Sequence, residues 1–246
     1  MKKLLILFVV LFFSAVCSAA SNIKIAVISD VHDSPDNRKM EKYFADALLL
    51  LKTEIKPDVL LITGDLVHLP EYTGLLKNLK ALLDKADFPV IVLPGNHDPK
   101  AEEFYKIFDP APDYLDVAGL RIVPFHDDEF IKGAKARRRP GDLDRMRNLD
   151  ENKPTVLVQH VSLFGNDGAL CPFNYENADD IFAAAKGKNI VLSVSGHFHQ
   201  GYPAEYYSDF PTVSVPAFCD AKAPVSVFEF SPKGVLLSHQ LHNVIR

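Results

Sequence analysis

A short stretch near the amino terminus decides the fold: residues 23–32, which read IKIAVISDVH. Its first seven residues are mostly apolar and β-branched, which is typical of a strand buried on both faces. The stretch ends in polar residues, with Asp30 and His32 directly after the strand. Apolar residues then recur at helical spacing over 40–55, and Pro57 follows the end of that pattern. A buried strand followed by a helix indicates an α/β fold.

The same unit recurs along the chain. Further buried strands and helices are predicted, in chain order, at 59–63, 75–86, 89–93, 120–125, 155–159, 178–186 and 190–194. This alternation implies a largely parallel, layered sheet. Three β segments near the carboxyl terminus, at 212–215, 225–230 and 235–238, are interpreted as a second sheet. We therefore predict an α/β fold: a two-sheet β sandwich flanked by helices.

Length and composition suit one globular unit. The chain has 246 residues, of which 48% are hydrophobic and 24% charged, close to the values of ordinary soluble proteins. We predict a single domain over residues 21–246, because neither a repeat nor a linker divides the sequence. The net charge of −5 gives no general affinity for nucleic acid, so stable nucleic-acid binding is not expected.

Residues 1–20 differ in character from the rest of the chain. Two lysines precede an apolar run over 4–16, and small residues follow at 17–20. This pattern predicts a signal peptide and an exported protein, either periplasmic or secreted. The run is shorter than the about 20 residues that a membrane span needs, so we expect no span once the signal is removed. An uncleaved N-terminal anchor is the alternative interpretation.

Two cysteines, Cys171 and Cys219, remain after removal of the signal. Export would expose them to an oxidising compartment, which favours a disulfide between them. A pair of buried thiols is the alternative.

Polar side chains follow five of the predicted strands. They are three aspartates, five histidines and one asparagine: Asp30, His32, Asp65, Asn96, His97, Asp98, His160, His197 and His199. Open α/β sheets hold their ligands at the carboxyl ends of the strands, so we expect these side chains to lie together. Imidazole and carboxylate groups suit zinc, iron or manganese, and nine groups exceed the needs of one ion. Two ions about 3.5–4 Å apart are the usual arrangement for attack on phosphorus.

Each cluster taken alone also has a structural interpretation. Gly64-Asp65 is an ordinary turn pair, and His160 alone would more often be a structural histidine. The segment Gly196-His197-Phe198-His199 is more informative, since an extended backbone puts both imidazoles on one side. Five such clusters at successive strand ends are not explained by caps and turns.

The ordered motifs resemble those of the calcineurin-like metallophosphoesterase superfamily. They are Asp30-x-His32, Gly64-Asp65, Gly95-Asn96-His97-Asp98, His160 and Gly196-His197-x-His199. The resemblance implies a four-layer αββα fold and a binuclear metal centre. By position, one metal site would consist of Asp30, His32, Asp65 and His199. The second would share Asp65 as the bridge and add Asn96, His160 and His197.

The resemblance also implies the chemistry. The reaction would be hydrolysis of a phosphate ester by a metal-bound hydroxide, with two ions such as manganese, iron or zinc. His97 matches a histidine outside the metal shell that protonates the leaving oxygen or steadies the transition state. Asp98 matches its orienting partner, which would fix the tautomer and tilt of the His97 ring. The natural substrate and the identity of the metals stay open.

Differences from the motifs of particular branches of this superfamily narrow the predicted activity. Protein phosphatases carry an arginine soon after Gly-Asp and a glutamate after Asn-His, whereas this chain has Leu66-Val67-His68-Leu69 and Asp98. Purple acid phosphatases have a tyrosine where this chain has His68. The sequence is closer to bacterial-type phosphodiesterases and small phosphatases, and we favour phosphodiesters. A phosphomonoesterase or nucleotidase is the alternative, as is a non-catalytic scaffold, which the presence of every matched residue disfavours.

Two charged segments allow more than one interpretation. The arginines at 137–139, 145 and 147 would form either a mobile lid over an anionic substrate or a solvated helix face. The run His126-Asp127-Asp128-Glu129 offers further potential ligands, but its spacing does not demand that role, and it is left outside the predicted site.

Overall fold

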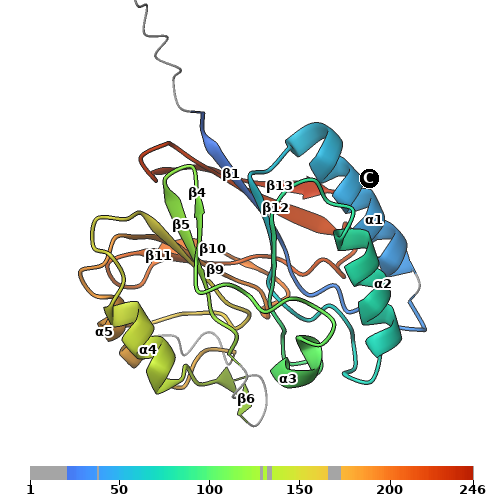
Figure 1. Cartoon of the computed structure of the whole chain (residues 1–246), viewed down its shortest axis with the longest axis horizontal. Coiled ribbons are helices and arrows are strands. Elements are labelled where there is room, and N and C mark those ends of the chain that lie inside the picture. Colours follow the sequence, from blue (N-terminus) through green and yellow to red (C-terminus); the bar gives the residue numbers. More distant parts are fainter. Residues whose placement is uncertain (1–20, 38, 128–129, 132–134, 166–172, 246) are drawn as a thin grey trace, which may run out of the picture.

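Two β-sheets lie at the centre of the molecule, and helices cover their outer faces (Figure 1). The computed structural model describes residues 21–37, 39–127, 130–131, 135–165 and 173–245. The first sheet has the order β13-β12-β1-β2-β3, with the bounds β1 Ile23–Ile28, β2 Val59–Ile62, β3 Val90–Val92, β12 Pro224–Phe230 and β13 Leu236–Asn243. The second has the order β10-β11-β9-β8-β5-β4, with the bounds β4 Leu115–Val117, β5 Leu120–Pro124, β8 Thr155–Val158, β9 Ile190–Ser195, β10 Tyr202–Tyr206 and β11 Pro211–Ser214. A separate pair joins β6 (Phe130–Ile131) to β7 (Lys135–Ala136).

Alternating side chains of the central strands build the layers. On β1, Ile25 and Val27 pack in the core between the two sheets, whereas Ala26 and Ile28 pack in the core beneath the helices of the first sheet. The second sheet divides in the same way, and Leu157 of β8 belongs to the core beneath its own helices. Strands buried on both faces therefore appear in the sequence as unbroken apolar runs.

Helices close the sandwich on both sides (Figure 1). The helical elements are α1 Lys39–Leu50, its π-helical continuation η1 Leu51–Ile55, α2 Thr73–Leu83, α3 Ala101–Phe104, α4 Pro140–Arg147 and α5 Ala178–Ala185. On α1, the side chains of Met40, Phe44 and Ala47 are buried, at the spacing of one helix face. Among the described residues, we find no helix with the length and apolar character that crossing a membrane requires.

The predicted two-sheet sandwich flanked by helices is confirmed, but the composition expected for its second sheet is wrong in part. β11 does belong to the second sheet, whereas β12 and β13 extend the first sheet, with Phe230 of β12 antiparallel to Ile23 of β1. The reason is burial, because β12 is almost entirely buried and needs a covered place beside β1. β13, which is far more exposed, forms the edge.

Candidate metal centre

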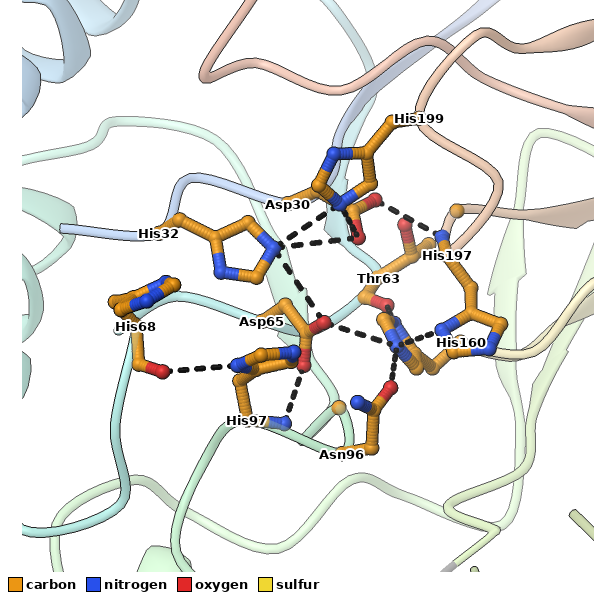
Figure 2. Close-up of polar contacts among 12 residues, drawn as sticks. Asp30, His32, Thr63, Asp65, His68, Asn96, His97, His160, His197 and His199 are labelled. Atoms are coloured by element: carbon orange, nitrogen blue, oxygen red, sulfur yellow. Dashed lines mark hydrogen bonds and ion pairs between the residues drawn. The ribbon is translucent and has the colours of Figure 1, made fainter. Parts of the chain in front are cut away.

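The loops after five strands, β1, β2 and β3 of one sheet and β8 and β9 of the other, meet in one cluster of polar side chains (Figure 2). Four residues of these loops have left-handed backbone conformations that non-glycine residues seldom adopt: Asp30 (φ 56°), His32 (φ 48°), Asp65 (φ 53°) and His197 (φ 66°). Strain of this kind is concentrated at functional sites, where the surrounding structure holds it.

Gly196 allows the loops of the two sheets to approach each other closely. A β-carbon at this position would lie 1.7 Å from Ser29 Oγ and 2.5 Å from Asp30 Oδ2. With glycine in place, the neighbouring amide of His197 donates to Asp30 Oδ2 at 2.9 Å. The glycine of the predicted Gly-His-x-His motif is thus required for a close backbone approach.

The first ligand group consists of Asp30, His32 and His199. The Nε2 atoms of His32 and His199 lie 3.1 Å apart. Asp30 Oδ1 lies 3.5 Å from Nε2 of His199 and 3.9 Å from Nε2 of His32. One carboxylate oxygen and two ring nitrogens therefore point toward a common point, as Figure 2 shows.

The second group consists of Asp65, His160 and His197, with Asn96 beside it. His160 Nε2 lies 3.0 Å from Asn96 Oδ1, 3.1 Å from His197 Nδ1 and 3.4 Å from Asp65 Oδ2. The other ring nitrogen of His160 contacts the Thr63 carbonyl oxygen at 2.7 Å. That contact orients the ring and leaves Nε2 directed into the group, as the outer partners of metal-bound histidines do.

Asp65 connects the two groups. Its Oδ2 lies 3.6 Å from His32 Nε2 in the first group and 3.4 Å from His160 Nε2 in the second. Its Oδ1 accepts the backbone N–H of His97 at 2.7 Å. The carboxylate is thus held between the groups by the loop that follows β3, which is the position a bridging ligand would require.

The electrostatics of the cluster fit bound cations. Hydrogen bonds to Asp30 and Cys219 raise the pKa of His199 to about 10. Burial lowers the pKa of His160, but the charges of Asp65 and Asp30, together with hydrogen bonds to Asp65 and Thr63, outweigh burial and raise this pKa to about 9. Without metal, protons on these two rings supply the positive charge that the buried carboxylates require. A metal ion would take the place of such protons, so the donor set fits the metals that the motifs imply.

His97 lies beside the two groups. The prediction that Asp98 contacts and orients the His97 ring is wrong. The His97 ring contacts the His68 carbonyl oxygen through Nδ1 at 2.8 Å. Both carboxylate oxygens of Asp98 instead accept backbone N–H groups, from Val67 at 3.1 Å and Gly95 at 2.9 Å. Asp98 therefore ties together the loops after β2 and β3, and burial raises its pKa to about 7, aided by repulsion from the Asp65 carboxylate.

His68 is a further histidine at the centre and was not among the site residues predicted from the sequence. Its ring stacks on His97, with centroids 5.5 Å apart, and meets His32 edge-on at 5.6 Å. Nitrogen atoms of these three histidines lie within 4.8 Å of one another, so they too could hold a cation. Its position in the sequence could have indicated a place at the site, since His68 follows Asp65 by three residues on the same loop.

Aromatic side chains line one side of the centre. A cavity of about 320 Å³ is lined by Asp65, Asn96, His97, Phe173, His197, Phe198, His199 and Gln200. Phe173 meets the His197 ring edge-on, with centroids 5.4 Å apart. Neither Phe173 nor Phe198 could be assigned to the site from the sequence, because isolated aromatic residues in loops carry no pattern that separates a site from a core.

The basic segment is not a simple solvated helix face, because one of its arginines lies in the interior, and a lid formed by the others stays a prediction. Arg138 is fully buried and pairs with Asp127 at 2.9 and 3.0 Å, which also accounts for part of the acidic run 126–129. Arg139 pairs with Asp142, and Arg145 donates to the Pro124 carbonyl oxygen at 2.7 Å. Asp128 and Glu129 lie outside the described residues.

Two sequence-based predictions involve residues outside the described part of the chain. The predicted signal at 1–20 is one of them. The other is the disulfide, because Cys171 lies outside the described residues and only Cys219, which is half-buried beside His199, can be placed. Both stay predictions.

A four-layer αββα fold with two groups of potential metal ligands on either side of one aspartate is typical of metal-dependent hydrolases. The model of the calcineurin-like phosphoesterase family matches residues 23–201, and the chain belongs to this family. It is therefore a hydrolase that acts on phosphate esters.

Solved structures with the same fold include phosphatases. A dimetal phosphatase from Danio rerio has a TM-score of 0.64 at 10% identity, over 90% of this chain and 99% of that one. The purple acid phosphatase PPD1 from yellow lupin (Lupinus luteus) seeds has a TM-score of 0.66 at 13% identity, over 92% of this chain and 52% of that one. The protein TT1561 from Thermus thermophilus has a TM-score of 0.62 at 12% identity, over 91% of this chain and 100% of that one. The search of curated proteins gave no match.

Proposed function

We propose that this protein is an exported phosphoesterase with two metal ions, and that it favours phosphodiesters. Asp30, His32 and His199 would hold one ion, while Asn96, His160 and His197 would hold the other, with Asp65 shared between them. The observation that carries the proposal is the position of Asp65 Oδ2, within 3.6 Å of a ring nitrogen from each group.

The bound ions would lower the pKa of water and neutralise charge on the phosphate oxygens. The chain itself supplies a proton donor beside them. The Nδ1 contact between His97 and the His68 carbonyl oxygen fixes the ring, and leaves Nε2 as the nitrogen that can protonate the leaving oxygen. Asp98 supports this geometry indirectly, because it holds the backbone of the loop that carries His97.

The charge of the cavity supports the preference for diesters. Among the described residues that line it, none is a lysine or an arginine. A phosphomonoester carries more negative charge than a diester at neutral pH, and this lining provides no side-chain cation for it. The fold shared with a dimetal phosphatase and a purple acid phosphatase favours a second candidate, a phosphomonoesterase, over more distant activities.

A matched substrate pair tests the proposal. Protein reconstituted with manganese, iron or zinc is assayed on bis-p-nitrophenyl phosphate and p-nitrophenyl phosphate, which share one leaving group. We expect a higher kcat/KM for the diester, and a higher value for the monoester would contradict the preference. His97→Gln should lower kcat by about 10²–10⁴-fold while keeping the metal content. Loss of metal from that variant would make His97 a ligand instead.

Export is tested separately from activity. The N-terminal residue of the mature protein, determined by mass spectrometry after expression in a Gram-negative host, should lie near position 21. An intact amino terminus in the membrane fraction would support the uncleaved anchor.

A further inference from the structure

Two phenylalanines face the cavity beside the candidate metal ligands. Phe173 and Phe198 are both partly exposed, and within the described residues neither belongs to one of the three hydrophobic cores. Their rings are tilted against each other, with centroids 6.1 Å apart. We call this pair the aromatic wall. Since the wall adds nothing to a core, its place at the cavity calls for another explanation.

The wall is held in place by its neighbours in the sequence. Asn174, next to Phe173, donates to the Phe164 carbonyl oxygen at 2.7 Å and accepts the Phe164 N–H at 3.1 Å. Phe198 lies in a tight bend, where its N–H donates to the Gly196 carbonyl oxygen at 2.7 Å. The backbone that carries each ring is thus held by hydrogen bonds, which lowers the entropy cost of ordering the wall on binding.

The wall and the proposed proton donor lie on different sides of Asp65. His97 meets the ring of His32 in the first group, with centroids 4.7 Å apart, whereas Phe173 meets the ring of His197 in the second group. Figure 2 shows His97 and His197 on opposite sides of Asp65. A phosphorus atom bound between the groups would therefore direct its leaving oxygen toward His97 and another substituent toward the wall.

Resting on the proposed diesterase function, we propose that the aromatic wall is the subsite for the ester group that does not leave, and that this group carries a planar aromatic ring. Aromatic rings prefer tilted or offset contacts of the kind that Phe173 and Phe198 offer. An aryl group and a nucleobase share this chemistry, because both present a π face to the phenylalanines. A small alkyl group would leave the wall exposed to water.

The test keeps the leaving group constant. Metal-loaded protein is assayed on four p-nitrophenyl phosphodiesters whose second group is methyl, cyclohexyl, phenyl or thymidine-5′-yl. We expect kcat/KM to be about tenfold higher for the phenyl or the thymidine ester than for the methyl ester. The cyclohexyl ester should lie below the phenyl ester if stacking matters beyond apolar area. The thymidine arm tells a nucleotide substrate from a simple aryl ester.

Leucine variants assign the preference to the wall. Phe198→Leu and Phe173→Leu keep apolar volume but remove the π face, so the ratio of phenyl to methyl kcat/KM should fall toward one. Tyr206→Leu, at an exposed aromatic residue on the edge strand β10 that does not line the cavity, should leave the ratio unchanged. Equal ratios in the wild type and in both wall variants would overturn the inference.

A binding measurement separates failure of the wall from failure of the diesterase proposal. Diphenyl phosphate and dimethyl phosphate are compared by calorimetry on metal-loaded protein. One possible result is that no diester is hydrolysed, but diphenyl phosphate binds about tenfold tighter than dimethyl phosphate and Phe198→Leu removes the difference. This result would support the aromatic wall as a binding subsite and contradict the diesterase proposal. Equal affinities in the wild type would overturn the wall whatever the activity.

Discussion

Replacing Arg138 by methionine should destabilise the protein more than any other single change in the basic segment. The Arg138 side chain is fully buried, and it donates to Asp127 at 2.9 and 3.0 Å and to the Tyr175 hydroxyl at 3.0 Å. Its guanidinium also lies 4.0 Å from the centroid of the Phe125 ring. Methionine keeps much of the apolar volume but leaves the Asp127 carboxylate buried without its cation. Breaking a buried ion pair in this way costs about 3–5 kcal/mol.

Urea unfolding of the metal-free protein measures the loss. Arg137→Met is the matched control, because Arg137 is half-exposed and pairs with Glu176 at the surface, where an ion pair contributes about 1 kcal/mol or less. The triple variant Arg138→Met, Asp127→Leu, Tyr175→Phe removes the guanidinium together with its carboxylate and hydroxyl partners, and leaves only the weak acceptor Met146 Sδ. It should recover most of the lost stability, since an apolar replacement of a whole buried network is often close to neutral.

Two results would refute this reasoning. The first is an equal loss in Arg138→Met and Arg137→Met, which would mean that Arg138 is solvated. The second is a triple variant as unstable as the single one, which would mean that the uncompensated charge is not the cause. A lid role for the arginines must therefore be tested at Arg137 or Arg139 alone, since a variant that includes Arg138 would confound binding with unfolding.

Three further predictions concern the site and its surroundings. Asp65→Asn should lower bound metal and kcat together, because one charge serves both groups; two retained metals with normal turnover, by elemental analysis and assay, would refute the bridge. Gly196→Ala should cost about 1–3 kcal/mol in urea unfolding and weaken metal binding, since its β-carbon would lie 1.7 Å from Ser29 Oγ; unchanged stability would refute the close approach. Burial raises the pKa of Asp33 from 3.8 to about 6, so its contribution to stability is present below pH 4 and is lost as pH rises through 6. Asp33→Asn, which does not titrate, should therefore gain stability over the wild type at pH 8 relative to pH 4, and a constant difference would refute the shift.

Much of the fold could be predicted because its central strands are buried on both faces. Burial of β1 and β2 requires the unbroken apolar runs at 23–28 and 59–62, and these are visible in any sequence. Which strands pair with one another could not be predicted from the sequence. β12 lies beside β1 although about 200 residues separate Ile23 from Phe230, and an apolar run does not indicate which sheet it joins.

The candidate site divides in the same way. Its ligand residues follow strand ends, so their convergence could be predicted from the topology of an α/β sheet. The contacts that hold the ligand-bearing loops in place could not be predicted from the sequence. The carboxylate of Asp98 accepts the backbone N–H groups of Val67 and Gly95 because the loops after β2 and β3 lie close together in the fold. The local sequence does not indicate that the two loops meet. The burial of Arg138 was hidden for a similar reason, since its partner Asp127 lies in a run that resembles a solvated acidic turn.

The division of the ligands between the two sheets has a mechanical consequence. Asp30, Asp65 and Asn96 follow strands of one sheet, whereas His160 and His197 follow strands of the other. Ions bound there would link the two sheets, adding metal–ligand bonds to the apolar packing between them and to the polar contacts of His197 with Asp30 and of His160 with Thr63. Chelation should then loosen the contact between the two sheets. Amide hydrogen exchange in β1 and β9 should accelerate together once the ions are removed.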